Sequence, residues 1–188
     1  VTQGPRVEEF EKEFAELTGA KHAVAVSNCT TALHLSLIVA GVGKGDEVIC
    51  PSLSYIATAN SIRYVGAKPV FAEVGDDYNL DIKDVEDRIT KNTKAILLVH
   101  QMGMPANIEA IKNICEKYSL ELIEDAACAI GSSYKKKMIG SHSDLVCFSF
   151  HPRKVITTGD GGMITTSRLD YCERLKKLRQ HGMSVNDR

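Results

Sequence analysis

Residues 94–125 read KAILLVHQMGMPANIEAIKNICEKYSLELIED, which is an apolar run, a helical pattern and a second apolar run. The runs at 94–100 and 120–123 are short and bounded by turn residues, so we predict two strands. Residues 108–118 have helical spacing, and Asn107 stands before them as an N-cap. This order predicts a parallel strand pair joined by a helical crossover.

The same alternation extends in both directions along the chain. Further apolar runs that are typical of strands lie at 22–26, 47–50, 69–72 and 144–148. Helical spacing recurs between them, at 31–40, 58–65 and 82–89, the last preceded by Asp81 as an N-cap. This repetition predicts an α/β fold of three layers, αβα, in which helices cover both faces of a mostly parallel sheet.

Three further segments complete the expected organisation. We expect an amphipathic helix at the start, on apolar positions with helical spacing: Val7, Phe10, Phe14 and Leu17. Residues 132–139, around three lysines, predict an exposed hairpin, and residues 168–180 predict a final helix. No linker or internal repeat divides the chain, which indicates one domain.

Charge and composition exclude several classes of function. The 23 Lys+Arg against 24 Asp+Glu leave a net charge of −1, so nucleic acid is not an expected partner. The longest apolar runs fall far short of the roughly 20 residues that span a bilayer, so we expect no membrane segment. The six cysteines form no CxxC pair and indicate reduced thiols in a cytoplasmic protein. The six histidines lack paired-ligand spacing, so no metal site is expected.

Three segments with polar or reactive side chains directly follow predicted strands, at the ends where open α/β sheets bind ligands. Residues 27–31, SNCTT, begin a helix and are either a phosphate site or a simple helix cap. Glu124 and Asp125 place carboxylates deep in the sheet, where a charge needs a partner, so they are either a structural cap or the counter-ion of a cationic group. Lys154, beside the Gly-rich residues 157–162, is either a nucleophilic amine or an exposed loop lysine.

Together the three segments suit one kind of chemistry. A phosphate site, a buried carboxylate and a reactive lysine are what a pyridoxal phosphate (PLP) enzyme needs, because the cofactor is held as a lysine imine with an acid at its pyridine nitrogen. Tyr55 follows another predicted strand, where an aromatic ring can pack on the cofactor.

The order of these motifs resembles the DegT/DnrJ/EryC1/StrS family of PLP-dependent sugar aminotransferases. The matching segments run from end to end: QGPRVEEFEKEFAELTG, SNCTTALHLSL, GDEVICPSLSYIATANSI, GAKPVFAEV, TKAILLVHQMG, IEDAACAIGS and FSFHPRKVITTGDGGMITT. The resemblance implies the large domain of the aspartate aminotransferase type, fold type I.

The resemblance also implies roles for single residues. Lys154 is the lysine that holds PLP as a Schiff base and moves the proton, and Asp125 pairs with the pyridine nitrogen. Tyr55 stacks on the ring, and Ala127 packs on its other side. The implied phosphate ligands are Thr30, Thr31 and Ser149.

Three positions depart from the family pattern, and one of them is Cys29, which replaces a frequent Gly. Cys128 stands where many members have Gln or His to contact the 3′ oxygen of the cofactor, and a thiol is a weaker hydrogen-bond partner. Asp160 stands where Glu is usual in the Gly-rich turn, which keeps the charge on a shorter side chain. We interpret all three as variation within the family.

The implied reaction is transamination, with glutamate as amino donor and a nucleotide-linked keto-sugar as acceptor. Its product is an amino sugar for a surface polysaccharide or a glycosylated metabolite, made by a homodimer whose active sites lie at the interface. The segments TTALHL, PSLSYIATANSI and KVITTG resemble the perosamine-synthase branch most, which favours a GDP-linked sugar.

Two alternatives remain beside transamination. A sugar dehydratase branch carries His at the lysine position, and Lys154 argues against it. Family members are also longer, so the resemblance implies that residues 1–188 are an N-terminal fragment, an incomplete cofactor-binding large domain without its small C-terminal domain. Such a fragment is either part of an enzyme or a catalytically incompetent binding or regulatory module; intact Asp125, Ser149 and Lys154 favour the enzyme.

Overall fold

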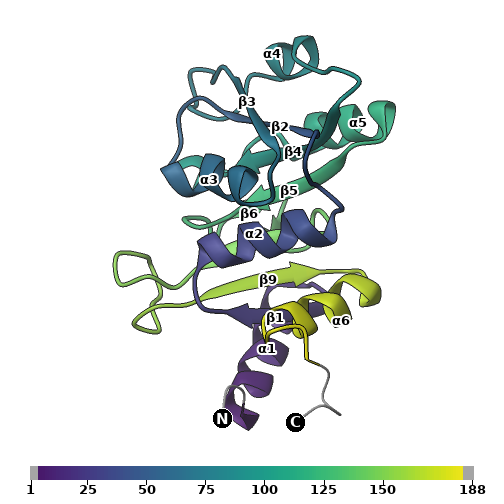
Figure 1. Ribbon diagram of the computed structural model, residues 1–188. Coiled ribbons are helices and arrows are strands. Elements are labelled where there is room, and N and C mark those ends of the chain that lie inside the picture. The colour runs from purple at the N-terminus through teal and green to yellow at the C-terminus, as the bar shows by residue number, and fades with distance from the viewer. Residues whose placement is uncertain (1–3, 184–188) are drawn as a thin grey trace.

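A computed structural model describes residues 4–183, which form a seven-stranded sheet flanked by helices, with a separate two-stranded hairpin (Figure 1). The sheet strands are β1 His22–Val26, β2 Glu47–Pro51, β3 Lys68–Ala72, β4 Thr93–Val99, β5 Glu121–Asp125, β8 Val146–Ser149 and β9 Gly162–Thr166. The hairpin pairs β6 Ser133–Tyr134 with β7 Lys137–Met138. The predicted strands and hairpin are thus present, with ends shifted by one or two residues.

Helices connect and cover these strands. Their bounds are α1 Pro5–Thr18, α2 Cys29–Val39, α3 Ile56–Tyr64, α4 Ile82–Asp87, the short 3₁₀ turn η1 Gln101–Gly103, α5 Ile108–Tyr118 and α6 Leu169–Leu178. Both predicted N-caps are confirmed, since the side chain of Asp81 accepts the Asp84 N–H and that of Asn107 accepts the Ala110 N–H. Across the described residues, no helix combines the length and apolar character needed to cross a membrane.

The strand order is β1-β9-β8-β5-β4-β2-β3. Strand β9 is antiparallel to the other six strands. The pairs β8–β5, β5–β4, β4–β2 and β2–β3 are parallel, which confirms the mostly parallel sheet. Apolar side chains of α2, α3 and α6 pack on one face, and those of α1, α4 and α5 pack on the other. The three-layer αβα prediction is therefore confirmed (Figure 1).

Three details differ from the sequence prediction. Strand β9 was not predicted, because its sequence, GMITT, is short and begins with glycine. It forms a strand because it pairs with β1 on one side and with β8 on the other. Burial on both faces was wrong for β3, where Phe71 is 48% exposed because β3 is an edge strand. In α1, Leu17 is exposed and Glu11 is buried instead, since Glu11 accepts the Ala25 N–H and pairs with Arg179.

Candidate functional site

One cavity of about 500 Å³ lies at the carboxyl ends of the parallel strands. These ends meet at one edge of the sheet because β1, β2, β4, β5 and β8 point the same way. The sequence-predicted residues that line it are Thr30, Tyr55, Asp125, Ala127, Cys128 and Lys154. Thr31 and Ser149 are not among its lining residues. The fold thus brings most of the predicted site together.

A larger hollow of about 890 Å³ lies between α1 and α6 and near β1. Its lining mixes opposite charges, among them Glu8, Lys12, Glu16, Lys176 and Lys177. Neither Asp125 nor Lys154 borders it. We therefore place the candidate site in the smaller cavity, where a buried carboxylate and a lysine share one space.

Asp125, the last residue of β5, is a buried carboxylate held by several donors. It accepts hydrogen bonds from the Ala127 N–H at 3.1 Å and from the Thr58 hydroxyl at 3.1 Å, and the Cys29 thiol lies 3.9 Å away. Burial raises the pKa of Asp125, while the bonds from Ala127 and Thr58 and the charge of Lys154 oppose that rise. The site therefore holds an oriented carboxylate at its floor.

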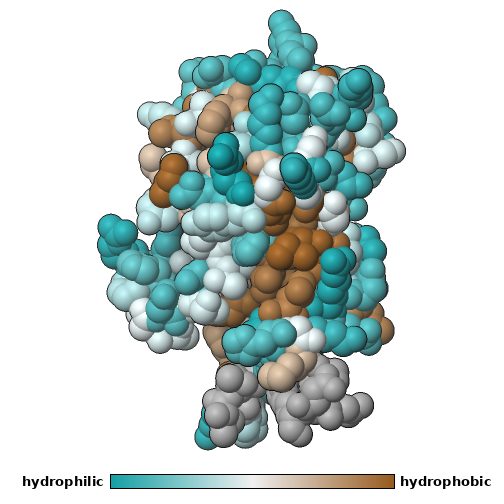
Figure 2. Space-filling model, viewed as in Figure 1, coloured by the Kyte–Doolittle hydropathy of each residue, from teal (hydrophilic) through white to brown (hydrophobic). Residues whose placement is uncertain are grey.

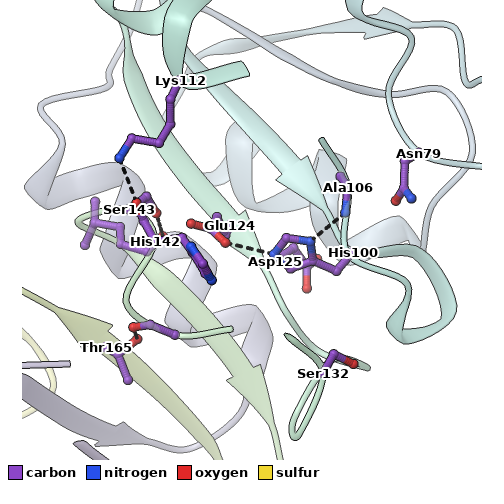
Figure 3. Close-up of polar contacts among 12 residues, drawn as sticks. Asn79, His100, Ala106, Lys112, Glu124, Asp125, Ser132, His142, Ser143 and Thr165 are labelled. Carbon is purple, nitrogen blue, oxygen red and sulfur yellow. Dashed lines mark hydrogen bonds and ion pairs between the residues drawn. The ribbon is translucent and has the colours of Figure 1, made fainter. Parts of the chain in front are cut away.

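Glu124 precedes Asp125 and points to the opposite face of the sheet, as alternation along a strand requires. Its Oε2 lies 2.8 Å from His100 Nε2, and neither side chain is exposed (Figure 3). His100 Nδ1 accepts the Ala106 N–H at 3.2 Å, so the ring proton sits on Nε2 and is donated to Glu124. His100 is thus a hydrogen-bonded residue in the wall of the cavity. Glu124 is a structural partner and does not line the cavity.

Lys154 is half-buried in the loop after β8, and its Nζ lies 3.1 Å from the Sγ of Cys128. Its backbone N–H donates to the His151 carbonyl at 2.8 Å, which closes a turn at the start of the loop. Cys128 is exposed on the turn that follows β5. The amine, the thiol and the Asp125 carboxylate therefore border the same cavity.

The N-terminus of α2 forms another wall. Asn28 caps the helix, since its Oδ1 accepts the Thr31 N–H at 2.8 Å and the Thr31 hydroxyl at 3.1 Å. The Thr31 hydroxyl also lies 3.0 Å from Ser27 Oγ, so it is engaged within the cap. Thr30 lines the cavity beside the positive end of the helix. This geometry suits an anion. Of the three predicted phosphate ligands, Thr30 is the one that lines the cavity.

Ser149 lies at the end of β8, opposite Gly162 of β9. A Cβ at Gly162 would lie 2.5 Å from the Asn28 carbonyl carbon and 2.8 Å from the Cys29 nitrogen. Only glycine allows β9 to pass this close to the start of α2. Ser149 is buried, and its hydroxyl oxygen accepts the His151 N–H at 3.4 Å.

Several site residues were missed by sequence reasoning. Thr58 was predicted only as the start of a helix, yet its hydroxyl bonds Asp125. Gln101 and Arg153 line the cavity and were given no role. Gln101 lies two residues after β4 and Arg153 four residues after β8. Position in a loop that follows a strand was the available signal, because the segments after β1, β2, β4, β5 and β8 all contribute to the lining. Within residues 4–183, no three His, Cys, Asp or Glu side chains gather in a way that could hold a metal ion.

Comparisons with known proteins place this geometry in context. The family model described as "DegT/DnrJ/EryC1/StrS aminotransferase family" matches residues 1–188. GDP-perosamine synthase of Caulobacter vibrioides is 48% identical over 186 residues, which cover 98% of this chain and 50% of that protein. The structure of S. venezuelae DesV superposes with a TM-score of 0.94 at 42% identity, over 96% of this chain and 49% of that one.

A further solved structure bears on the cofactor. Spr1654 of Streptococcus pneumoniae, a sugar aminotransferase described as the PLP form, superposes with a TM-score of 0.93 at 31% identity, over 98% of this chain and 53% of that one. The chain spans about half the length of the curated relatives that it matches.

Proposed function

Because the chain belongs to the DegT/DnrJ/EryC1/StrS aminotransferase family, we propose that it carries the PLP site of a nucleotide-sugar aminotransferase. The observation that carries this proposal is the meeting of Lys154 and buried Asp125 at one cavity. In this proposal residues 1–188 are cofactor-binding large domain, and the activity is that of the whole protein to which they belong.

The residues at the cavity fit PLP by their chemistry. A primary amine, an oriented carboxylate and a helix N-terminus match the three polar ends of the cofactor, which are its aldehyde, its pyridine nitrogen and its phosphate. When bound, PLP supplies an electron-withdrawing ring that takes up the electrons released from a substrate Cα–H bond. Leu33, Ala57 and Val99 add apolar wall to the cavity beside these polar groups.

Lys154 and Asp125 perform the proton chemistry in this proposal. Lys154 Nζ would hold the cofactor and, when free, would accept the proton from the substrate Cα as a general base. Asp125 would keep the pyridine nitrogen protonated, and the Ala127 N–H and Thr58 hydroxyl orient its carboxylate. The buried setting strengthens this pairing because water does not screen it.

The remaining predicted residues position the cofactor. Thr30 and the free N–H groups at the start of α2 bind the phosphate, with Ser149 and the Thr31 cap beside them. Tyr55 would pack on one face of the ring and Ala127 on the other, while Cys128 would contact the 3′ oxygen. The lining of the cavity and the family pattern support these roles.

The substrates follow from the family and from the named relatives. We assign a keto-sugar linked to a nucleoside diphosphate as the acceptor and glutamate as the donor. Similarity to GDP-perosamine synthase favours a GDP-linked sugar and an amino sugar product for polysaccharide synthesis. The six free thiols fit a cytoplasmic location, where thiols stay reduced.

A homodimer with shared active sites is the partner that we propose. Large apolar side chains next to the cavity are exposed: Tyr55, Ile56, Met102, Val155 and Ile156. Figure 2 shows apolar side chains at the surface over α3, which begins at Ile56, and between α2 and α6. Apolar surface of this kind is typical of a protein–protein interface.

Absorption spectroscopy with borohydride reduction tests the cofactor site. Purified chain is mixed with PLP, the visible band of lysine-bound PLP is recorded, and the complex is reduced and mapped by mass spectrometry. We expect the reduced adduct on the Lys154 peptide. The matched variants are Lys154→Arg, which loses the band, and Lys135→Arg, which keeps it because Lys135 lies on the hairpin and pairs with Glu109 of α5.

The same experiment has a clear negative result. Adducts spread over exposed lysines, with equal yield in Lys154→Arg, would show that this cavity does not bind PLP. Transfer of an amino group from glutamate to GDP-linked keto-sugars is then assayed in the full-length protein, with dTDP- and UDP-linked sugars as comparison substrates.

A further inference from the structure

Cys128 and Lys154 bring two nucleophiles into contact on one wall of the cavity. The Lys154 Nζ lies 3.1 Å from the Cys128 Sγ, although 26 positions separate them in the chain. Both side chains border the cavity, and Cys128 is exposed to solvent. A small oxidant that enters the cavity therefore meets the thiol with an amine already beside it.

Both backbones are fixed, so this contact does not depend on chance encounters. The turn that carries Cys128 is closed by the Ala127 N–H on Asp125 and by the Ala129 N–H on the Ala126 carbonyl. Gly103 packs against the Cys128 carbonyl so closely that a Cβ there would lie 2.7 Å from the oxygen. The Lys154 N–H donates to the His151 carbonyl at 2.8 Å, which positions the backbone of the second residue. The two groups are thus preorganised for reaction.

The other cysteines are protected from the same chemistry. Among the cysteines of the described residues, the remaining five are buried: Cys29, Cys50, Cys115, Cys147 and Cys172. Burial raises the pKa of each of these thiols, to about 12 for Cys50 and for Cys115. They stay protonated and hidden, and the thiolate is the form that reacts with oxidants. Oxidation is therefore directed to Cys128.

We propose that Cys128 and Lys154 form a redox modification site, at which a hydroperoxide joins them through a covalent sulfur–nitrogen bond. Hydrogen peroxide first oxidises the Cys128 thiol by two electrons to a sulfenic acid and is itself reduced to water. The lone pair of the neutral Lys154 amine then attacks sulfur, hydroxide leaves, and the nitrogen proton joins it as water. One thiol, one amine and one peroxide give one S–N bond and two waters.

The bond consumes the amine that the proposed cofactor needs. If the proposed function holds, crosslinking and PLP binding exclude each other, and oxidation switches the site off until a thiol reductant cleaves the bond. Only this consequence rests on the proposed function. The crosslink itself depends on the contact between the two side chains alone.

Peroxide treatment of the purified, cofactor-free chain tests the proposal. We expect the intact mass to fall by two hydrogen atoms, and peptide mapping to join the peptides of Cys128 and Lys154. Dithiothreitol restores the original mass. Chain unfolded in guanidinium before peroxide addition gives no such product, because the two groups are then apart.

Three variants locate the bond. Cys128→Ser loses the crosslink, and Lys154→Arg also loses it but leaves a sulfenic acid that dimedone traps at Cys128. Lys135→Arg, a change at another surface lysine, keeps the full yield. Overoxidation of Cys128 without a crosslink, or a crosslink that persists in Lys154→Arg, overturns the proposal.

Addition of PLP separates this proposal from the proposed function. Where PLP occupies Lys154, the crosslink disappears and the borohydride adduct forms in its place. A crosslink that forms equally with and without PLP, together with no adduct at Lys154, contradicts the cofactor site and leaves the redox site standing. An adduct at Lys154 with no crosslink in the free chain supports the cofactor site and overturns the redox site.

Discussion

Asp125 shows how one side chain is prepared by its surroundings. The residue is 6% exposed, and burial by itself favours the protonated form of its carboxyl group. The N–H of Ala127 and the hydroxyl of Thr58 counter this preference by donating to its two oxygens. The residue is therefore kept at a cost in folding stability, which is typical of a functional group.

Replacement of this carboxyl group gives a prediction with a definite sign. Because the pKa of Asp125 is raised in the folded state, the folded state binds the proton more tightly than the unfolded state does. Its stability contribution is complete below the unfolded pKa of about 3.9 and is lost as the pH rises through the folded pKa, by about 1.4 kcal/mol per unit of the rise. We expect Asp125→Asn to gain stability relative to the parent as the pH rises from about 4 to about 7. Urea denaturation at several pH values measures the difference.

Asp170 provides the control with the opposite sign. Its side chain pairs with Arg168, which lowers the pKa of Asp170. The stability that this pair contributes is present above the unfolded pKa and lost as the pH falls through the folded pKa. The parent should therefore be more stable than Asp170→Asn near neutral pH, and this difference should disappear in acid. A parallel response of the two variants to pH contradicts the burial argument for Asp125.

At the scale of elements, two helices share the same cap but border different spaces. Asn28 caps α2 at the cavity, and Asn107 caps α5 on the opposite face of the sheet. We expect Asn28→Ala and Asn107→Ala each to lower the free energy of unfolding by about 1 kcal/mol. Only Asn28→Ala should also weaken PLP binding, because it loosens the helix N-terminus that we assign to the phosphate. Chemical denaturation and PLP titration separate the two effects, and equal loss of PLP affinity in both variants contradicts the assignment.

The strands β4 and β5 are joined by the buried His100–Glu124 pair as well as by their backbone ladder. We expect His100→Leu to cost about 3–5 kcal/mol of unfolding free energy, because it leaves the Glu124 carboxyl group buried without a donor. Glu124→Gln should cost less, since the amide oxygen still accepts the His100 Nε2 proton. Urea denaturation measures both.

An exposed ion pair is the control for this buried one. Lys117 and Glu86 join α5 to α4 at the surface, where both side chains reach solvent. Lys117→Ala should leave the free energy of unfolding almost unchanged. Similar costs for Lys117→Ala and His100→Leu refute the claim that burial makes the inner pair important.

At the scale of the whole molecule, the apolar residues around the cavity remain uncovered. Val155 is 81% exposed immediately after Lys154, and Tyr55 is 71% exposed on the facing loop. We expect Val155→Asp to weaken self-association about tenfold or more in Kd, because it places a charge in the proposed dimer interface. Leu17→Asp, at an exposed position of α1 on the opposite face of the sheet, should leave association unchanged. Sedimentation velocity over a range of protein concentrations measures self-association of the parent and of both variants. A parent chain that stays monomeric at every concentration rules out the proposed interface.

Local patterns along the chain determined the layers of the fold and part of the site. Alternating apolar runs predicted the parallel strands, and Asp81 and Asn107 predicted two helix starts, because a cap acts within a few residues of chain. Asp125 and Lys154 were recognised from the residues around them. Their roles toward PLP stay predictions.

Contacts between distant segments were decided by the tertiary structure alone. Strand β9 exists because β1 and β8 supply hydrogen bonds on both of its sides, which no pattern within GMITT reveals. The Thr58 hydroxyl on Asp125 and the Lys154 amine on the Cys128 thiol depend on which strand ends meet at the cavity. A sequence determines local propensity and burial period, whereas packing of the whole chain sets the ångström-scale distances between side chains on which chemistry depends.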